Sequence, residues 1–134
     1  MQLQQVPLEW APKVWGQVSH FFVAAVTHAQ GDYSLDHMQT MVCTGQWLLV
    51  VVTEAEQIHG AIVVSVFNRP AARVGFVHAL GGKGIVTDNT IMQFKALVAA
   101  LGATEIEGAV RESVARLVRR VGLREKYRIV GAAI

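Results

Sequence analysis

The chain has 134 residues, of which 52% are hydrophobic and 16% are charged, and its formal net charge at pH 7 is +2. This length predicts a single domain, residues 1–134, that is large enough to bury its own core, and this composition excludes intrinsic disorder. The longest central apolar run, Trp47 to Val52, is too short to cross a bilayer, so no membrane partner is expected.

The first half of the chain predicts a strand, two helices and three further strands. Pro7 ends the first strand, and Pro12 suits the first turn of the helix that follows. Ser34 is a favourable N-cap for the second helix, and Gly45 is placed to end it. Short turns join the next three strands, which we therefore expect to form an antiparallel meander. The expected ranges are Leu3–Pro7, Glu9–Thr27, Leu35–Thr44, Gln46–Glu54, Ile58–Asn68 and Arg73–Leu80.

The second half predicts crossovers instead of hairpins. The glycine-rich segment Gly81–Gly84 is a loop, and a helix follows from about Asn89 to Leu101, with Asp88 at its N-cap position. This helix is long enough to connect two parallel strands, the second being Thr104–Val110. A basic helix then begins at Glu112 and is expected to end at Gly122, because glycine commonly follows a helix.

A last strand is expected to contain Tyr127 and to end the unit that runs from Glu105 to Ile134. The whole element order is then β-α-α-β-β-β-α-β-α-β. A meander followed by crossovers gives an α/β (α+β) fold, with a mixed central sheet and helices on both faces.

The carboxyl-terminal unit also carries a resemblance. The segments Arg119-Arg120-Val121-Gly122-Leu123 and Tyr127-Arg128-Ile129 stand in a strand–helix–strand context that resembles the last third of the GCN5-related N-acetyltransferase (GNAT) family. The element order is similar to that of the family over essentially the whole chain. Within the family, the chain resembles a divergent short form, similar to GNAT-like proteins of tailed bacteriophages.

The resemblance implies where a cofactor would bind. In the family, a signature after the fourth strand reads Gln or Arg, two residues, Gly, one residue, and Gly or Ala, and its backbone amides hold the pyrophosphate of acetyl-CoA. Here the corresponding stretch is Gly81–Val86, so any bound acetyl-CoA would contact Gly82, Lys83, Gly84, Ile85 and Val86. Gly81 and Val86 depart from the signature. A carboxylate at Asp88 is also expected to compete with phosphate for the helix amides and to repel it.

The catalytic positions of the family are incompletely matched. Its general-acid tyrosine corresponds to Val118, which cannot donate a proton, and Tyr127 is the nearest substitute. A general base is expected near the middle of the sheet, and His78 is the best-placed candidate, ahead of Glu54 and His59. No metal site is predicted, because the five histidines lack the spacing of metal ligands.

Two functions follow from these observations. The departures at Val86, Asp88 and Val118 favour a GNAT-fold protein without catalysis or cofactor, namely a structural or assembly component of a bacteriophage virion, in the head–tail region or the tail. The apolar content of 52% also favours a protein that binds itself or other virion proteins. The alternative is an acetyl-CoA-dependent N-acetyltransferase that acts on an unidentified amine. The sequence leaves open whether the protein is an enzyme.

Partners and compartment are predicted from charge and cysteine content. Arg116, Arg119 and Arg120 form a basic cluster that could meet an anionic partner. Nucleic acid is not the expected partner, because no aromatic residues alternate with these arginines. The single cysteine, Cys43, and the lack of a recognisable signal peptide predict the host cytoplasm, with incorporation into the virion under the first hypothesis.

Overall fold

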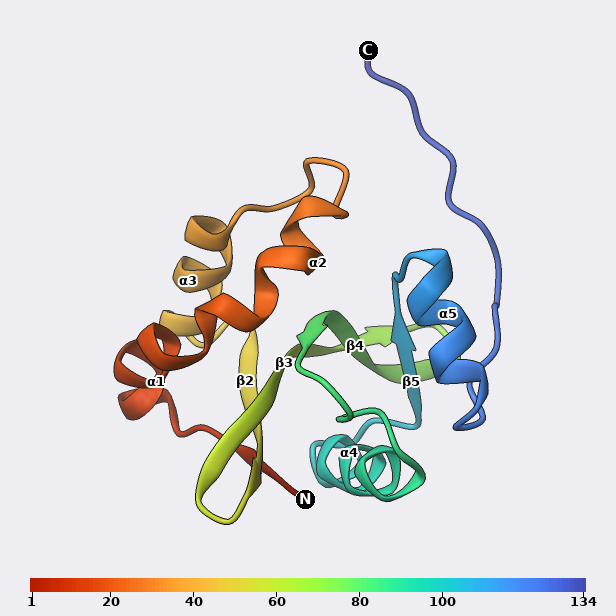
Figure 1. Cartoon of the computed structure of the whole chain (residues 1–134). Coiled ribbons are helices and arrows are strands. Elements are labelled where there is room, and N and C mark those ends of the chain that lie inside the picture. The colour runs from red at the N-terminus through yellow and green to blue at the C-terminus, as the bar shows by residue number, and fades with distance from the viewer.

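The computed structural model describes residues 1–134. It contains five strands, five α-helices and two short 3₁₀ helices, arranged around one sheet (Figure 1). In chain order, the elements are β1 (Gln2–Gln5), η1 (Leu8–Trp10), α1 (Ala11–Val18), η2 (Ser19–Phe22), α2 (Val23–Thr27), α3 (Leu35–Cys43), β2 (Leu48–Glu54), β3 (Gln57–Arg69), β4 (Ala72–Gly81), α4 (Asp88–Ala100), β5 (Glu105–Gly108) and α5 (Glu112–Arg119).

The strands lie in the order β1-β2-β3-β4-β5. The first four pair antiparallel, and β5 pairs parallel to β4 after the crossover through α4. The expected meander and the expected parallel step are both confirmed. None of the helices is long and apolar enough to span a membrane.

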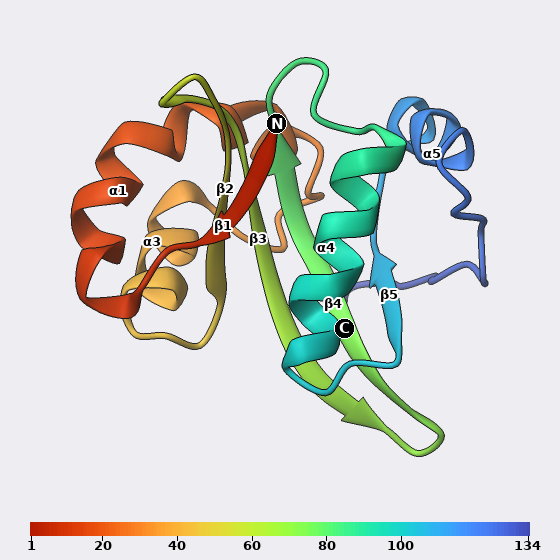
Figure 2. The same ribbon diagram turned by 90° about the horizontal axis from the view of Figure 1, so that it is seen from below.

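Apolar side chains pack on both faces of this sheet. Along β2, Leu49 and Val51 point into a core that they share with α1 and α3, whereas Val50 and Val52 point into a second core that they share with α4. Successive side chains of a strand face opposite sides, so a strand buried on both faces reads as the continuous apolar run seen here. Figures 1 and 2 show α1 and α3 on one side of the sheet and α4 on the other, which confirms helices on both faces.

The structure corrects two of the expected elements. The helix expected over Glu9–Thr27 is divided into α1, η2 and α2, because the turn at Ser19–Phe22 tightens into a 3₁₀ helix that places Phe22 in the core. The last strand of the expected order does not form. Residues 120–134 have no regular secondary structure after α5 and its turn, and the carboxyl terminus lies away from the rest of the molecule (Figure 1).

Side-chain caps define where α3 and α4 begin. Ser34 caps α3 as expected, and the His37 ring completes the motif by accepting a hydrogen bond from the Ser34 amide at 3.1 Å. The cap of α4 is Thr87 and not Asp88, because the Thr87 hydroxyl accepts a hydrogen bond from the amide of Thr90. Asp88 is the first helical residue, where a carboxylate still favours the helix dipole.

Glycines allow three backbone segments to cross closely where β4 ends. A Cβ at Gly81 would lie 1.9 Å from the carbonyl oxygen of Phe21, and a Cβ at Gly82 would lie 2.3 Å from that of His59. Gly60 is equally restricted, because its Cβ would lie 2.5 Å from the carbonyl oxygen of Gly81. These contacts hold the end of β4 against β3 and η2, and they fix where the following loop starts.

We expect Gly81→Ala to destabilise the fold by about 2–3 kcal/mol, because the new methyl group would overlap backbone atoms that cannot move independently. Gly16→Ala is the matched control. Gly16 lies inside α1 with open space around its Cβ position, so this substitution should stabilise the fold by roughly 0.5–1 kcal/mol. The free energy of unfolding in urea measures both effects. Equal stability of Gly81→Ala and the wild type would contradict the close approach of the Gly81 and Phe21 backbones.

Candidate functional site

The two parallel strands part halfway along β4. Residues Val74–Val77 of β4 pair with Glu105–Gly108 of β5, and β5 ends there. β4 continues to Gly81, and over these last residues it pairs only with β3 on its other side. The backbone along the β5 side of His78–Gly81 therefore has no strand partner.

A β-bulge lies at the same point. Val64 of β3 faces Val77, and Val63 faces Ala79, so His78 is an extra residue in β4. A bulge bends its strand and changes the direction of nearby side chains, which is why bulges often occur at functional sites. The sequence showed that His78 lies late in a strand, but it gave no signal that this residue would be bulged.

The His78 side chain lies among aromatic rings and one hydroxyl group. Its ring stacks on Trp47 with 4.0 Å between the centroids, and it lies 5.0 Å from the ring of Phe76. Nε2 is 2.7 Å from the Ser65 hydroxyl oxygen, and Nδ1 makes no hydrogen bond within the protein. The Tyr33 hydroxyl donates to the His78 carbonyl oxygen at 2.8 Å, which fixes the backbone of the bulge.

Burial changes the acid–base properties of this group. Desolvation lowers the pKa of His78 from 6.5 to about 4, because a partly buried imidazolium loses much of its hydration. Burial, with a further contribution from Asp32, also raises the pKa of Tyr33. At neutral pH both side chains are therefore uncharged, and His78 can accept a proton at Nδ1 when Nε2 carries the ring hydrogen.

An ion cluster lies on the same face, at the end of β5. We use this name for Arg69, Glu105, Glu107 and Lys126. Glu107 is only 7% exposed, and Arg69 contacts it at 2.6 Å. Lys126 reaches both carboxylates, at 2.5 Å from Glu107 and 3.2 Å from Glu105. Hydrogen bonds from Lys126 and from Arg69 lower the pKa of Glu107, so this residue is a poor candidate for a general base.

The aromatic rings connect the ion cluster to His78. Phe76 lies beside Glu107 in the strand pairing, and its ring is 6.0 Å from that of Phe67. The guanidinium of Arg69 lies over the Phe67 ring, 5.2 Å from its centroid. This face of the sheet thus has an uncharged aromatic half around His78 and an ionic half around Glu107. The pairing of β4 with β5 ends between these two halves.

In the loop after β4, Gly82, Lys83 and Gly84 are exposed, whereas the apolar side chains turn toward the core. Ile85 is buried in the core beneath α4, and Val86 packs against the same core. Val86, whose size departs from the family signature, is half-buried against this core. Lys83 is exposed between Gly82 and Gly84, both of which have positive φ angles that favour glycine.

The first turn of α4 leaves two amides without partners. The Thr87 amide donates to the Thr90 hydroxyl at 2.9 Å, and the Thr90 amide donates to the Thr87 hydroxyl. The cap therefore uses the amides of these two residues. The amides of Asp88 and Asn89 have no acceptor within the protein. Free amides at a helix amino terminus after a glycine-rich segment are donors of the kind that can bind an anionic group such as a diphosphate. The exposed Asp88 carboxylate reduces the attraction, but it does not take these amides as an N-cap would.

Other candidates from the sequence lie elsewhere. Val118 is the buried residue of α5 and provides no acid, and Tyr127 lies in the carboxyl-terminal segment near Arg69. Glu54 is at the tip of the β2–β3 hairpin, where it pairs with the amino terminus at 3.9 Å. No group of three or more potential metal-ligating side chains occurs in the structure. The side chains of Arg116, Arg119 and Arg120 are exposed on and just after α5.

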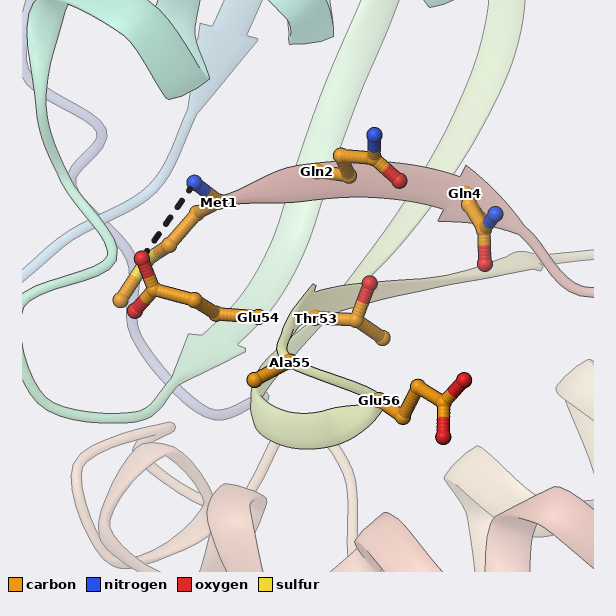
Figure 3. Close-up of a pocket in the computed structure, with 7 residues that line it drawn as sticks. All are labelled: Met1, Gln2, Gln4, Thr53, Glu54, Ala55 and Glu56. Atoms are coloured by element: carbon orange, nitrogen blue, oxygen red, sulfur yellow. Dashed lines mark ion pairs between the residues drawn. The ribbon is translucent and has the colours of Figure 1, made fainter.

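One surface depression is remote from His78. It has a volume of about 490 Å³ and lies between β1 and the β2–β3 hairpin, at the opposite edge of the sheet from β5 (Figure 3). Its lining residues are Met1, Gln2, Gln4, Thr53, Glu54, Ala55 and Glu56. These are mostly exposed polar groups without a buried nucleophile or base, so this depression is not the candidate site.

Comparison with known proteins gives the fold and not the family. No family model and no curated protein sequence matches the chain. Among solved structures, an aminoglycoside acetyltransferase from an uncultured soil metagenomic sample, in complex with sisomicin, superimposes with a TM-score of 0.71 at 12% identity, covering 99% of this chain and 94% of that one. A ribosomal-protein-alanine N-acetyltransferase from Brucella melitensis biovar Abortus 2308 gives 0.67 at 12% identity, with 100% of both chains covered.

A third example is an aminoglycoside 6′-N-acetyltransferase from Acinetobacter haemolyticus, with a TM-score of 0.67 at 15% identity over 100% of this chain and 98% of that one. These similarities confirm a GNAT fold for the chain. These structures do not test the resemblance to the divergent form found in phages.

The lowered pKa of His78 predicts a pH-dependent stability. The folded state keeps the ring neutral down to about pH 4, whereas the unfolded chain binds a proton near pH 6.5. Between these two pH values the unfolded state binds more protons than the folded state. The contribution of His78 to the free energy of unfolding is therefore complete above pH 6.5 and is lost as the pH falls toward 4. Because the ring is partly exposed, we expect a loss of about 1–2 kcal/mol, less than the full linkage value.

Urea unfolding at pH 7 and at pH 4.5 measures this loss. The His78→Phe variant keeps an aromatic ring against Trp47 but cannot titrate, so its stability should change less between the two pH values. His28→Gln, at an exposed position after α2, is the control for loss of a histidine. An NMR titration that placed the His78 pKa above 6 would contradict the assignment.

Proposed function

We propose that this protein is an acetyl-CoA-dependent acetyltransferase that acts on an amine. The observation that carries the proposal is the parting of β4 and β5 next to the bulged His78, with a glycine loop and free helix amides at the end of the same strand. Fold neighbours that acetylate aminoglycosides or a ribosomal protein support the same reading.

The chain offers distinct groups to each part of such a cofactor. The amides of residues 82–84, Asp88 and Asn89 would hold a diphosphate, and Lys83 would add a positive charge beside it. The unpaired edge of His78–Gly81 would bind the thioester end through backbone hydrogen bonds. The bound cofactor would supply an activated acetyl group, whose transfer forms an amide and releases a thiol.

The protein must also remove a proton from the acceptor amine. His78 is neutral at pH 7, and its unbonded Nδ1 is the available acceptor. A pKa near 4 makes it a weaker base than an ordinary imidazole, so its contribution belongs at the lower end of general-base catalysis. No acid occupies the Val118 position, so the leaving thiolate would take its proton from another source, such as water.

A second candidate function is assembly, including a role as a bacteriophage virion component. It is favoured by the exposed apolar side chains of Ile129, Val130 and Ile134 in the carboxyl-terminal segment. This function does not exclude catalysis, because those residues lie outside the groups assigned to acetyl transfer.

Binding of acetyl-CoA tests the proposal first. We expect isothermal titration to give a dissociation constant tighter than about 100 µM, or roughly 5.5 kcal/mol. Asp88→Asn removes a repelling charge near the proposed diphosphate and should tighten binding by about two- to fivefold. Lys83→Ala should weaken it by a similar factor. Lys95→Ala removes an exposed charge in the middle of α4 and should change nothing. The absence of measurable heat with the wild-type protein would contradict the proposal.

Catalysis is tested by thiol release with two acceptor probes, sisomicin and a peptide that begins with alanine, which represent the substrates named for the fold neighbours. We expect release above the rate of hydrolysis with at least one probe. His78→Phe should lower kcat by about 10²-fold while leaving the KM for acetyl-CoA within twofold, as expected for a general base. Tight binding of acetyl-CoA with equal rates for His78→Phe and the wild type would remove His78 from the catalytic site.

A further inference from the structure

Ser65 places a hydroxyl group on β3 next to the His78 ring. It is the polar residue within the apolar run Ala61–Phe67, and it is half-buried. Its side chain makes one hydrogen bond, which joins its oxygen to Nε2 of His78 at 2.7 Å. A partly buried hydroxyl needs such a partner to offset the loss of its hydration. The strand pairing brings the two groups together, because Ser65 faces Phe76, two residues before His78.

The two nitrogens of the His78 ring have different surroundings. Nε2 is bonded to Ser65, whereas Nδ1 makes no hydrogen bond within the protein. Nε of Arg69 is the one buried side-chain nitrogen or oxygen without a partner, so Nδ1 of His78, which also lacks one, is not buried. One edge of the ring is therefore held by the protein, and the other edge is accessible to a ligand.

Other groups hold the ring itself in place. Trp47 stacks on it with an angle of 13° between the two planes, and the Phe76 ring is 5.0 Å away. The Tyr33 hydroxyl fixes the His78 carbonyl group. These contacts involve ring faces or the backbone, so they set the direction of the ring but not the nitrogen that carries its hydrogen. Among the side chains around His78, Ser65 is the one that bonds a ring nitrogen.

The hydroxyl of Ser65 can select the tautomer of His78. A neutral imidazole has one N–H and one acceptor nitrogen, and the partner of one nitrogen decides the state of the other. We propose that Ser65 is a positioning residue for His78, and that it accepts a hydrogen bond from Nε2–H so that Nδ1 keeps its lone pair for the acceptor amine. This inference rests on the proposed acetyl transfer.

The same hydrogen bond favours the state that follows proton transfer. When Nδ1 takes a proton from the amine, the ring becomes an imidazolium, and Nε2–H becomes a charged donor. Hydrogen bonds from charged donors are stronger than those from neutral ones, so the bond to Ser65 stabilises the imidazolium. Without the hydroxyl, an Nε2–H has no acceptor in the protein, whereas an Nδ1–H can donate to water. The ring hydrogen then moves toward Nδ1, which removes the lone pair that the reaction needs.

Long-range ¹H–¹⁵N NMR spectra of protein with labelled histidine identify the tautomer at pH 7 without any cofactor. We expect Nε2–H in the wild type, and a ratio of Nε2–H to Nδ1–H that falls about two- to tenfold in Ser65→Ala. Ser65→Thr retains a hydroxyl and should keep the wild-type ratio. Tyr33→Phe is the control, because it removes a hydrogen bond to the His78 backbone and should leave the ratio unchanged. A wild-type ring hydrogen on Nδ1, or an unchanged ratio in Ser65→Ala, would overturn the proposal.

Thiol release with acetyl-CoA and the acceptor probes measures the effect on transfer. Ser65→Ala should lower kcat by about two- to tenfold and leave the KM for acetyl-CoA within about twofold. In a His78→Phe background the same substitution should change nothing, because Ser65 acts only through His78. A further loss of rate in that background would overturn the proposal. An inactive wild-type chain would overturn the proposed function and this role together, whereas an active chain with the ring hydrogen on Nδ1 would overturn the role of Ser65 alone.

Discussion

The structure depends on unequal pairing along β4. On one side, β4 is bonded to β3 along its whole length, so its position is fixed. On the other side, β5 pairs with it only as far as Val77, and the remaining residues have no strand partner there. The bulge at His78 and the glycine contacts of Gly81 and Gly82 occur in this second half. A rigid strand with one open edge is a suitable support for a ligand, because binding requires no rearrangement of the sheet.

The loop and helix beyond β4 show where two residues that weaken the resemblance to the family, Val86 and Asp88, lie. Val86 lacks the small size that the signature requires, and its half-buried side chain packs against the core beneath α4. Thr87 takes the N-cap position, so Asp88 opposes an anion by charge alone and does not compete for the helix donors. The sequence-based preference for a degenerate scaffold rested on Val86, Asp88 and Val118, and the structure weakens only the part that concerns Asp88 as an N-cap.

The fold was predictable from sequence wherever local signals were strong. Continuous apolar strands joined by short turns indicated the meander, and the Ser34 cap and glycine ends located the helices. The missing last strand was not predictable, because Tyr127–Ile134 has strand propensity and only the tertiary structure shows that it stays unpaired. The environment of His78 depends on contacts with Trp47 and Ser65, which are 31 and 13 residues away in sequence, so its bulge and lowered pKa lay outside sequence reasoning.

The central claim is that the open edge of β4 and the amides that follow it form one continuous binding surface for a coenzyme A thioester. Backbone ¹H–¹⁵N NMR spectra recorded during titration with acetyl-CoA test this most directly. We expect shifts concentrated in residues 78–81 and in the segment from Lys83 to Asn89. Shifts confined to α5 and its arginines, or no shifts at all, would contradict it.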